Sequence, residues 1–145
     1  MKLVKTLALT AFSLTLFACN GQERKITLQQ LPVTAQAFIK NNFPNQATDY
    51  IIEDKSLKKT EYEVRFTGGA EIEFDGKGAW KEVDANTTLM PVAILPTGVT
   101  IYLNQNYKGQ QVEKIEKNIR GYEVELANGP ELKFDTKGNF LRIDD

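Results

Sequence analysis

The sequence predicts an α+β fold in which tandem helix-plus-four-strand repeats form one antiparallel sheet of up to eight strands. Three observations lead to this prediction: a long internal repeat, an apolar helical stripe at the start of each copy, and strand-like alternation through the rest of each copy. Both helices are expected on one face of the sheet. The other face is polar, and no sequence remains to cover it.

The internal repeat relates residues 31–84 to a second copy that starts at Leu95. Tyr62-Glu63-Val64, for example, corresponds to Tyr122-Glu123-Val124. The offset is 64 residues at the front and 60 at the back, so the first copy carries four extra residues around Ser56–Thr60. Either copy alone would bury too little surface to be stable, and two copies are too few for a stacked array. We therefore expect the two copies to share one core.

Each copy opens with an apolar stripe at helical spacing. In the first copy the stripe consists of Ala35, Phe38, Ile39 and Phe43. The second copy repeats it with Val99, Tyr102, Leu103 and Tyr107. Pro32 suits the first turn of a helix, while Pro44 and Gly109 mark where the two helices should end.

Four strand-like segments follow each helix, and they alternate apolar and polar residues. In the first copy they cover residues 48–54, 62–66, 71–75 and 79–84. In the second they cover residues 112–117, 122–126, 131–134 and 139–144. Gly68-Gly69 and Asn128-Gly129 lie between the second and third segments, which is a strong signal for a two-residue hairpin.

The N-terminus has the pattern of an export signal. Lys2 and Lys5 precede an apolar run from Leu7 to Phe17, which has the length of a signal-peptide core and is too short to span a bilayer. The run ends in Leu16-Phe17-Ala18-Cys19, which resembles a bacterial lipobox. The alternative is an ordinary secretory signal that is cut near Ala18, with Cys19 incidental.

Cys19 is the only cysteine of the chain, so the protein can form no intrachain disulfide. Its thiol would be consumed if a lipid were attached there, and two or more acyl chains anchor a protein stably. Asn20 rather than an aspartate follows, so we expect sorting to the outer membrane, facing the periplasm or the cell surface. The predicted organisation is a signal peptide over residues 1–18, a lipid-anchored tether over 19–27, and one domain over 28–145 with repeats at about 28–84 and 92–145.

Composition argues against catalysis and against a nucleic-acid partner. Without Lys2 and Lys5, 16 basic residues stand against 19 acidic ones, a net charge of −3, whereas nucleic-acid binding needs a clustered basic face. The chain has no histidine, so it lacks the commonest general base and metal ligand. We expect no enzymatic activity, no cofactor and no metal.

Several aspartates could be given a chemical role. Asp75 and Asp135 could be imagined as an acid–base pair, but each begins an Asp-x-Lys-Gly hairpin turn, where aspartate is normal turn chemistry. Asp84, Asp144 and Asp145 could add oxygens to a calcium site, although the spacing of an EF-hand is missing. We expect the first pair to be turn residues and the others to be solvated.

The last strand of each copy indicates which side chains face solvent. Val83 and Ile143 are its natural core residues, so alternation places Trp80 and Phe140 on the opposite face. The same alternation puts ten charged residues on that face: Glu63, Arg65, Glu71, Glu73, Glu82, Glu123, Glu125, Glu131, Lys133 and Arg142. Two aromatic rings among charges would suit a binding surface. The alternative is a bulge at the glycine before each strand, which would bury both rings.

The order of these motifs resembles a known family. Leu31-Pro32, Tyr62-Glu63-Val64 and the segment from Glu71 to Asp84 are similar to the putative β-lactamase-inhibitor-like, PepSY-like domain of exported Bacteroidetes proteins. The resemblance covers nearly all of residues 28–145, and its most specific part is a Phe-Asp-x-Lys-Gly-x-aromatic turn that both copies carry. It implies helices on one side of a sheet and a concave open face on the other, as in β-lactamase inhibitory proteins.

Three classes of function remain compatible with the sequence. The first is a lipid-anchored envelope module that binds a protein or peptide on the open sheet face, with inhibition of a hydrolase as one version. The second is a passive structural or stress-related envelope lipoprotein. The third is a sensor that binds a small ligand or a cation through its acidic face. We expect the first.

Overall fold

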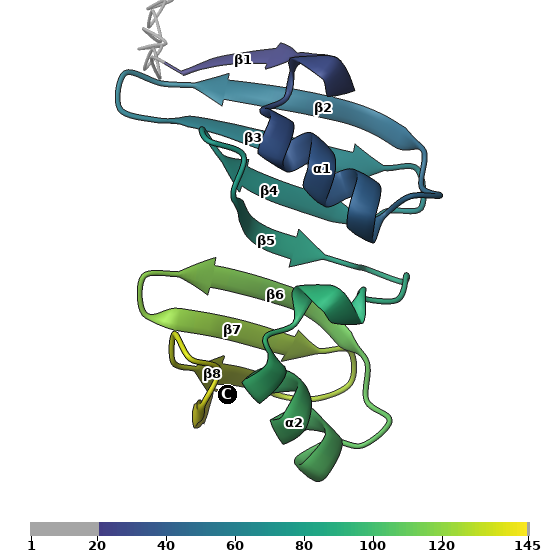
Figure 1. Cartoon of the computed structure of the whole chain (residues 1–145), viewed down its shortest axis with the longest axis vertical. Coiled ribbons are helices and arrows are strands. Elements are labelled where there is room, and N and C mark those ends of the chain that lie inside the picture. The colour runs from purple at the N-terminus through teal and green to yellow at the C-terminus, as the bar shows by residue number, and fades with distance from the viewer. Residues whose placement is uncertain (1–20, 145) are drawn as a thin grey trace, which may run out of the picture.

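The computed structural model describes residues 21–144, which fold into one sheet with two helices on the same face (Figure 1). The predicted signal peptide, Cys19, Asn20 and Asp145 lie outside the described residues. The elements are β1 (Gln22–Lys25), the short 3-10 helix η1 (Leu28–Gln30), α1 (Val33–Asn42), β2 (Thr48–Lys55), β3 (Thr60–Phe66), β4 (Glu71–Asp75), β5 (Trp80–Asp84), η2 (Val92–Ile94), α2 (Thr97–Asn106), β6 (Val112–Asn118), β7 (Gly121–Leu126), β8 (Glu131–Phe134) and β9 (Phe140–Asp144).

The sheet is an antiparallel meander, in which each strand pairs with the next strand along the chain. The predicted α+β class, with a helix and four strands in each repeat, is confirmed. The two repeats meet where β5 pairs with β6, so one sheet runs through both. This junction is narrow: three residue pairs join β5 to β6, and Val83 opposite Ile115 lies at its centre.

The sheet has one strand more than the sequence predicted. Residues 22–25, expected to be part of a tether, form β1, which pairs with β2 in register from Gln22 opposite Lys55. All four residues of β1 are exposed, so the segment has no apolar alternation that could signal a strand. Backbone pairing holds it instead, together with an ion pair of 2.5 Å from Arg24 Nε to Glu53 Oε2.

The core lies between the helices and the sheet, and it is continuous across both repeats. One row of apolar side chains crosses eight strands from β2 to β9: Ile51, Val64, Ile72, Val83, Ile115, Val124, Leu132 and Ile143. All but the last are buried. Ile143 was expected in the core, but it is 46% exposed because β9 is the free edge of the sheet.

Each helix covers its own repeat with an aromatic side chain. Phe38 of α1 meets the ring of Phe74 edge-to-face at 5.6 Å, and Tyr102 of α2 meets Phe134 in the same way at the same distance. Such contacts add to the free energy of burying the rings. Within residues 21–144, neither helix has the length and apolar content needed to cross a membrane.

The turn before the last strand of each repeat fastens the sheet to the helix. Asp75 Oδ1 accepts hydrogen bonds from the backbone N–H groups of Lys77 and Ala79, each at 2.9 Å, and Asp135 does the same in the second repeat. Gly78 has a φ of 83°, and a side chain there would meet Pro32 Cβ at 2.7 Å. The turn therefore needs glycine both for its backbone angle and for its contact with the start of α1.

Candidate functional site

Trp80 and Phe140 do not lie where strand alternation placed them. In β5 the register shifts, so that Glu82 lies opposite Glu73 but Trp80 lies opposite Phe74, and β9 shows the same shift. The extra residue turns Trp80 and Phe140 onto the helix-covered face. The prediction that both rings form part of the open face is wrong. The bulge lies within each strand, at Lys81 and Leu141, rather than at the preceding Gly78 and Gly138.

On the helix-covered face, both rings are partly buried and pack against the core. Phe140 stacks on Tyr102 with 4.2 Å between ring centroids. Trp80 lies 6.2 Å from Phe38, and Lys117 Nζ lies 4.8 Å from the centroid of the indole ring. The lysine on β6 thus contacts the last strand of the first repeat through a cation–π interaction.

The ten charged residues predicted for the open face do lie on it, because the register of β3, β4, β7 and β8 is regular there. We use "open face" for the sheet surface opposite α1 and α2. Paired residues form rows across the strands on this surface. One row runs from β3 to β9 through Glu63, Glu73, Glu82, Glu116, Glu123, Lys133 and Arg142.

The first five members of this row, the glutamate row, put a carboxylate on each of five adjacent strands. Directly opposite residues have Cβ atoms about 5 Å apart, and like charges in such positions oppose folding. A neighbouring row contains Arg65, Glu71, Asp84, Lys114, Glu125, Glu131 and Asp144. Together with Lys81, these two rows hold ten carboxylates and five cationic groups, so the open face carries an excess of negative charge.

Three lysines offset part of this charge, and sequence alternation found only one of them. Lys81 Nζ lies 2.7 Å from Glu61 and 3.9 Å from Glu73, and Lys114 Nζ lies 2.8 Å from Glu82. Lys81 occupies the β5 bulge, and Lys114 follows a second register shift in β6. Simple alternation therefore could not assign either to this face.

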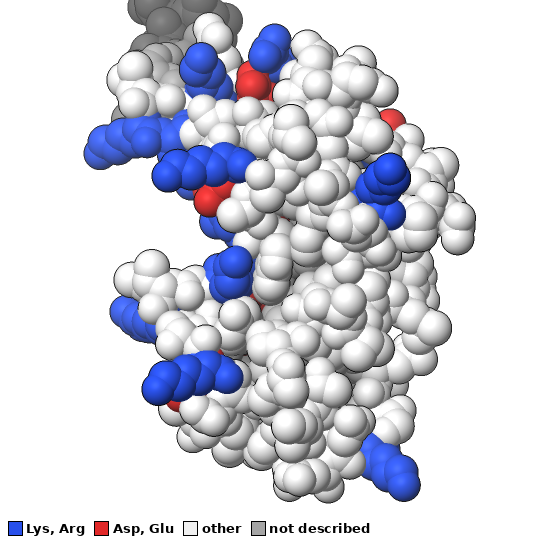
Figure 2. All heavy atoms as spheres, in the orientation of Figure 1, with Lys and Arg blue, Asp and Glu red and all other residues white. Residues whose placement is uncertain are grey.

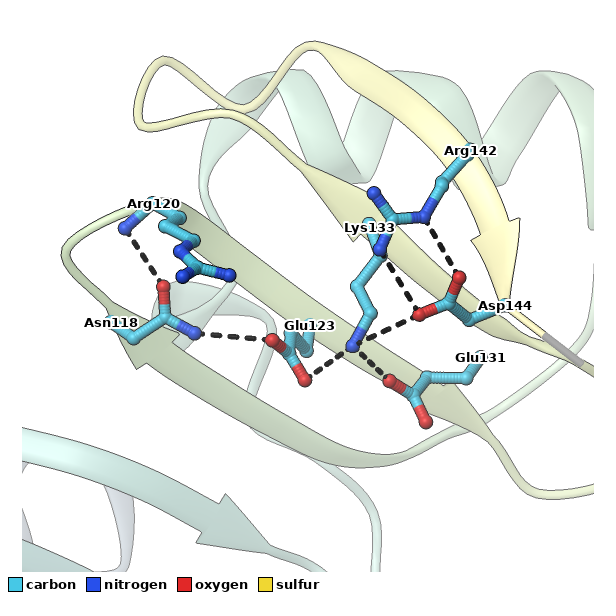
Figure 3. A network of polar contacts seen from close by, with 7 residues as sticks. All are labelled: Asn118, Arg120, Glu123, Glu131, Lys133, Arg142 and Asp144. Atoms are coloured by element: carbon cyan, nitrogen blue, oxygen red, sulfur yellow. Dashed lines mark hydrogen bonds and ion pairs between the residues drawn. The ribbon is translucent and has the colours of Figure 1, made fainter.

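The best-paired cation is Lys133, which was predicted (Figure 3). Its side chain is only 15% exposed, and its Nζ lies 2.5 Å from Glu123 and 3.5 Å from Asp144, with a further contact to Glu131. Burial favours the neutral amine, but the hydrogen bonds that the ammonium donates to Glu123 and Glu131 outweigh it and raise the pKa of Lys133. The same contacts lower the pKa of Glu123.

Glu73, the second member of the glutamate row, is in the opposite situation. Burial and the neighbouring charge of Glu82 raise the pKa of its carboxyl, and Lys81 opposes them only in part. At neutral pH this carboxylate is less stable than it would be in water. A cationic group brought to the open face would therefore gain from meeting Glu73.

The other carboxylates considered for chemistry have structural roles. Asp75 and Asp135 bond to the backbone of their own turns, as the turn interpretation requires. Asp84 accepts a hydrogen bond from the N–H of Asn86, and Asp144 pairs with Arg142. Among residues 21–144, no group of three or more acidic, histidine or cysteine side chains is arranged to hold a metal ion.

A hollow of about 620 Å³ lies where β5 and β6 diverge beyond their paired segment. Trp80, Lys81, Lys117, Ile119 and Tyr122 line it. Figure 2 shows it as the indentation at the left margin, bordered by Lys and Arg side chains, while most of the helix-covered side is uncharged. No motif predicted this hollow, because it depends on how few residues pair at the junction of the repeats.

The chain matches the family model described as "Putative beta-lactamase-inhibitor-like, PepSY-like" twice, over residues 18–63 and 60–142. The two matches meet within β3, so the boundary between them lies inside the first repeat. No curated protein is detectably similar to the chain.

Three solved structures are similar to most of the chain. A putative calcium-regulated periplasmic protein from Bacteroides thetaiotaomicron is 41% identical, covers 85% of this chain and 97% of its own, and superposes with a TM-score of 0.81. Two putative periplasmic proteins from Bacteroides vulgatus are 39% and 36% identical, with TM-scores of 0.80 for both. They cover 85% and 86% of this chain, and 97% and 100% of their own.

Proposed function

The chain belongs to the PepSY-like, putative β-lactamase-inhibitor-like family, and on this premise we propose that it is a lipid-anchored binding module of the cell envelope. Its partner is a basic protein or peptide segment held on the open face. The observation that carries the proposal is the glutamate row, because five carboxylates on adjacent strands oppose folding and the lysines beside them offset only part of that charge.

The charges of the open face support a basic partner in particular. The open face has ten carboxylates and five cations, so added positive charge would reduce the repulsion among the carboxylates. Glu73 would be stabilised in particular, because burial and Glu82 destabilise its charged form. A lysine or arginine placed over the row would form charge-assisted hydrogen bonds, which are stronger than neutral ones. An acidic partner would face repulsion over the same strands.

Two further observations support export and lipid anchoring. The similar solved proteins are described as periplasmic, and the sequence around Cys19 resembles a lipobox. Labelling cells with a clickable palmitate analogue tests the anchor: the wild-type protein should be labelled, and the Cys19→Ser protein should not. An unlabelled wild-type protein would show that Cys19 is not acylated.

Site-specific photo-crosslinking in intact cells tests the binding surface. A crosslinking amino acid at Glu125, which is exposed on β7, should give an adduct with a discrete partner. The same residue at exposed Gln105 on α2 should not. Glu73→Gln with Glu82→Gln should abolish the adduct at position 125. Asn41→Lys with Gln105→Lys, which changes the net charge equally on the helices, should leave it unchanged. Equal adducts from both positions would contradict the proposal.

A cation sensor is the second candidate, and one observation favours it. A solved protein that is 41% identical is described as calcium-regulated. The described residues hold no preformed cluster of three ligands, so calcium would act here by neutralising the charge of the glutamate row. A ligand that binds only the native state raises the melting temperature. Calcium, compared with magnesium at equal concentration, should then raise it in the wild type and not in the Glu73→Gln, Glu82→Gln variant. No calcium-specific shift would remove this candidate.

A further inference from the structure

One end of the sheet collects four of its hairpins and the start of the described chain. Because the sheet is a meander, the turns β2–β3, β4–β5, β6–β7 and β8–β9 all lie at the same end, on the left in Figure 1. We call this the hairpin end. β1 also begins there, since Gln22 pairs with Lys55 at the last residue of β2.

Two tips of the hairpin end carry the most exposed large apolar side chains of the described residues. Leu57 in the β2–β3 turn is 91% exposed, and Ile119 in the β6–β7 turn is 96% exposed. They occupy corresponding turns of the two repeats. Neither side chain belongs to the core, so packing within the domain does not explain an aliphatic residue at these tips.

Basic residues surround the two tips. The segments of the hairpin end hold seven of them: Lys55, Lys58, Lys59, Lys77, Lys117, Arg120 and Lys137. The two aspartates of the same turns, Asp75 and Asp135, direct a carboxylate oxygen to backbone N–H groups. Figure 2 shows Lys and Arg side chains along this margin, whereas they are sparse on the opposite, right-hand side.

Positive and negative charges are therefore concentrated in different regions of the domain, even though the net charge is negative. The open face carries an excess of carboxylates. At the hairpin end the seven basic residues outnumber the acidic ones, which are Glu23, Asp54, Glu61, Asp75 and Asp135. Among the ion pairs of residues 21–144, only Lys59 of these seven cations has a partner, Glu61. Aliphatic side chains at exposed tips, flanked by lysine and arginine, are typical of surfaces that insert shallowly into an anionic lipid interface.

We propose that the hairpin end is a docking surface for an anionic phospholipid bilayer. Leu57 and Ile119 enter the interface between head groups and acyl chains, and the basic side chains around them meet lipid phosphates. This proposal depends on the proposed function only in that both place a lipid anchor at Cys19. Cys19 precedes Gln22 by three residues, which span no more than about 10 Å. A lipid at Cys19 would hold the start of β1, and with it the hairpin end, against the membrane.

This orientation has a consequence for the open face. The strands would stand upright on the bilayer, because their axes run from the hairpin end to the opposite end. The glutamate row would then be carried at the side of the molecule, clear of the anionic lipid that would repel it. A basic partner could reach it from the aqueous compartment.

Vesicle binding by an unlipidated protein tests the docking surface without the anchor. The protein is residues 19–145 with Cys19→Ser, which retains the entire sheet. Similar proteins with solved structures cover 85% of this chain, so we expect this part to fold without the signal peptide. It should co-sediment with vesicles of equal parts phosphatidylethanolamine and phosphatidylglycerol, and not with phosphatidylcholine vesicles. Added salt should release it, because screening weakens attraction to a charged surface. Equal binding to both kinds of vesicle, or none to either, would overturn the proposal.

Matched variants locate the contact. Lys58→Glu with Arg120→Glu should weaken binding to the anionic vesicles at least about tenfold. Lys40→Glu with Lys108→Glu makes the same change in net charge at the opposite end and should have little effect. Equal losses in both variants would show a net-charge effect and overturn the assignment. A fluorophore on Leu57→Cys in the Cys19→Ser background should shift to the blue on binding, while one on Leu89→Cys should not. Palmitate labelling can fail without affecting any of these results, so the two proposals are tested separately.

Discussion

The two repeats share a skeleton but differ in the charge of the open face. Glu63, Glu73 and Glu82 lie side by side in the first repeat. The corresponding positions of the second repeat hold Glu123, Lys133 and Arg142. The pKa of Glu73 is raised by burial and by Glu82, whereas the carboxylates around Lys133 hold that lysine in its charged form.

The comparison separates what folding requires from what it leaves free. The buried pair of Phe74 and Phe134, the aspartate turns, and the positive-φ glycines of those turns, Gly78 and Gly138, are common to both copies. The open face makes no contact with either helix, so its charges could diverge without changing the fold. In the second repeat, Lys133 and Arg142 replace two of the three glutamates, whereas the first repeat has a carboxylate at all three positions, which a basic partner could neutralise.

The largest expected effect tests whether the two copies are equivalent in the core. Phe74→Ala and Phe134→Ala should each lower the free energy of unfolding by about 3–5 kcal/mol, because the two rings are 0% and 2% exposed. Unfolding in denaturant should remain one transition, since the core row crosses the junction of the repeats. Two separate transitions in the wild type would show that the repeats fold independently.

The next effect tests the balanced network of the second repeat. Lys133→Ala removes a cation from Glu123, Glu131 and Asp144 and leaves three carboxylates close together. The loss should be about 2 kcal/mol, less than for a fully buried ion pair because the network is partly exposed. Chemical denaturation measures it, and Lys137→Ala, at an exposed turn, is the control. A loss no greater than that of the control would show that the network contributes little.

A charge exchange should make the first repeat resemble the second. Glu73→Lys places a cation between Glu63 and Glu82, as Lys133 lies between Glu123 and Arg142. The free energy of unfolding should rise by about 0.5 kcal/mol, because two like-charge contacts are replaced by attractive ones. Thermal unfolding measures the change. If the variant is less stable than the wild type, the glutamate row is not the source of unfavourable charge that the comparison implies.

The smallest effect depends on pH. The pKa of Glu73 is higher in the folded than in the unfolded protein, so its contribution to stability is fully present below its ordinary pKa and is lost as the pH rises through the raised value. Glu73→Gln should therefore be more stable than the wild type at neutral pH, by no more than about 0.5 kcal/mol for this half-exposed side chain. The difference should vanish below about pH 4. A difference that does not change with pH would contradict the assignment.

The sequence predicted the repeats, both helices and eight of the nine strands, because these depend on local periodicity. The apolar residues around Phe38 lie on one side of the chain only if the segment is a helix. Those around Val64 lie on one side only if it is a strand. Most of the charged residues of the open face follow from the same alternation. β1 was missed because its pairing with β2 is made by the backbone, and its side chains carry no pattern.

The tertiary structure alone decided two kinds of feature. In one, a strand departs from regular alternation; in the other, the position of a side chain depends on a strand that is distant in the sequence. The extra residue in β5 moved Trp80 to the helix-covered face and Lys81 to the open face. The pairing of β5 with β6 joined the glutamates of the two repeats into one row. Side-chain periodicity within a segment determines which residues can be buried. Register between segments is set by the whole sheet, and register decides which charges meet.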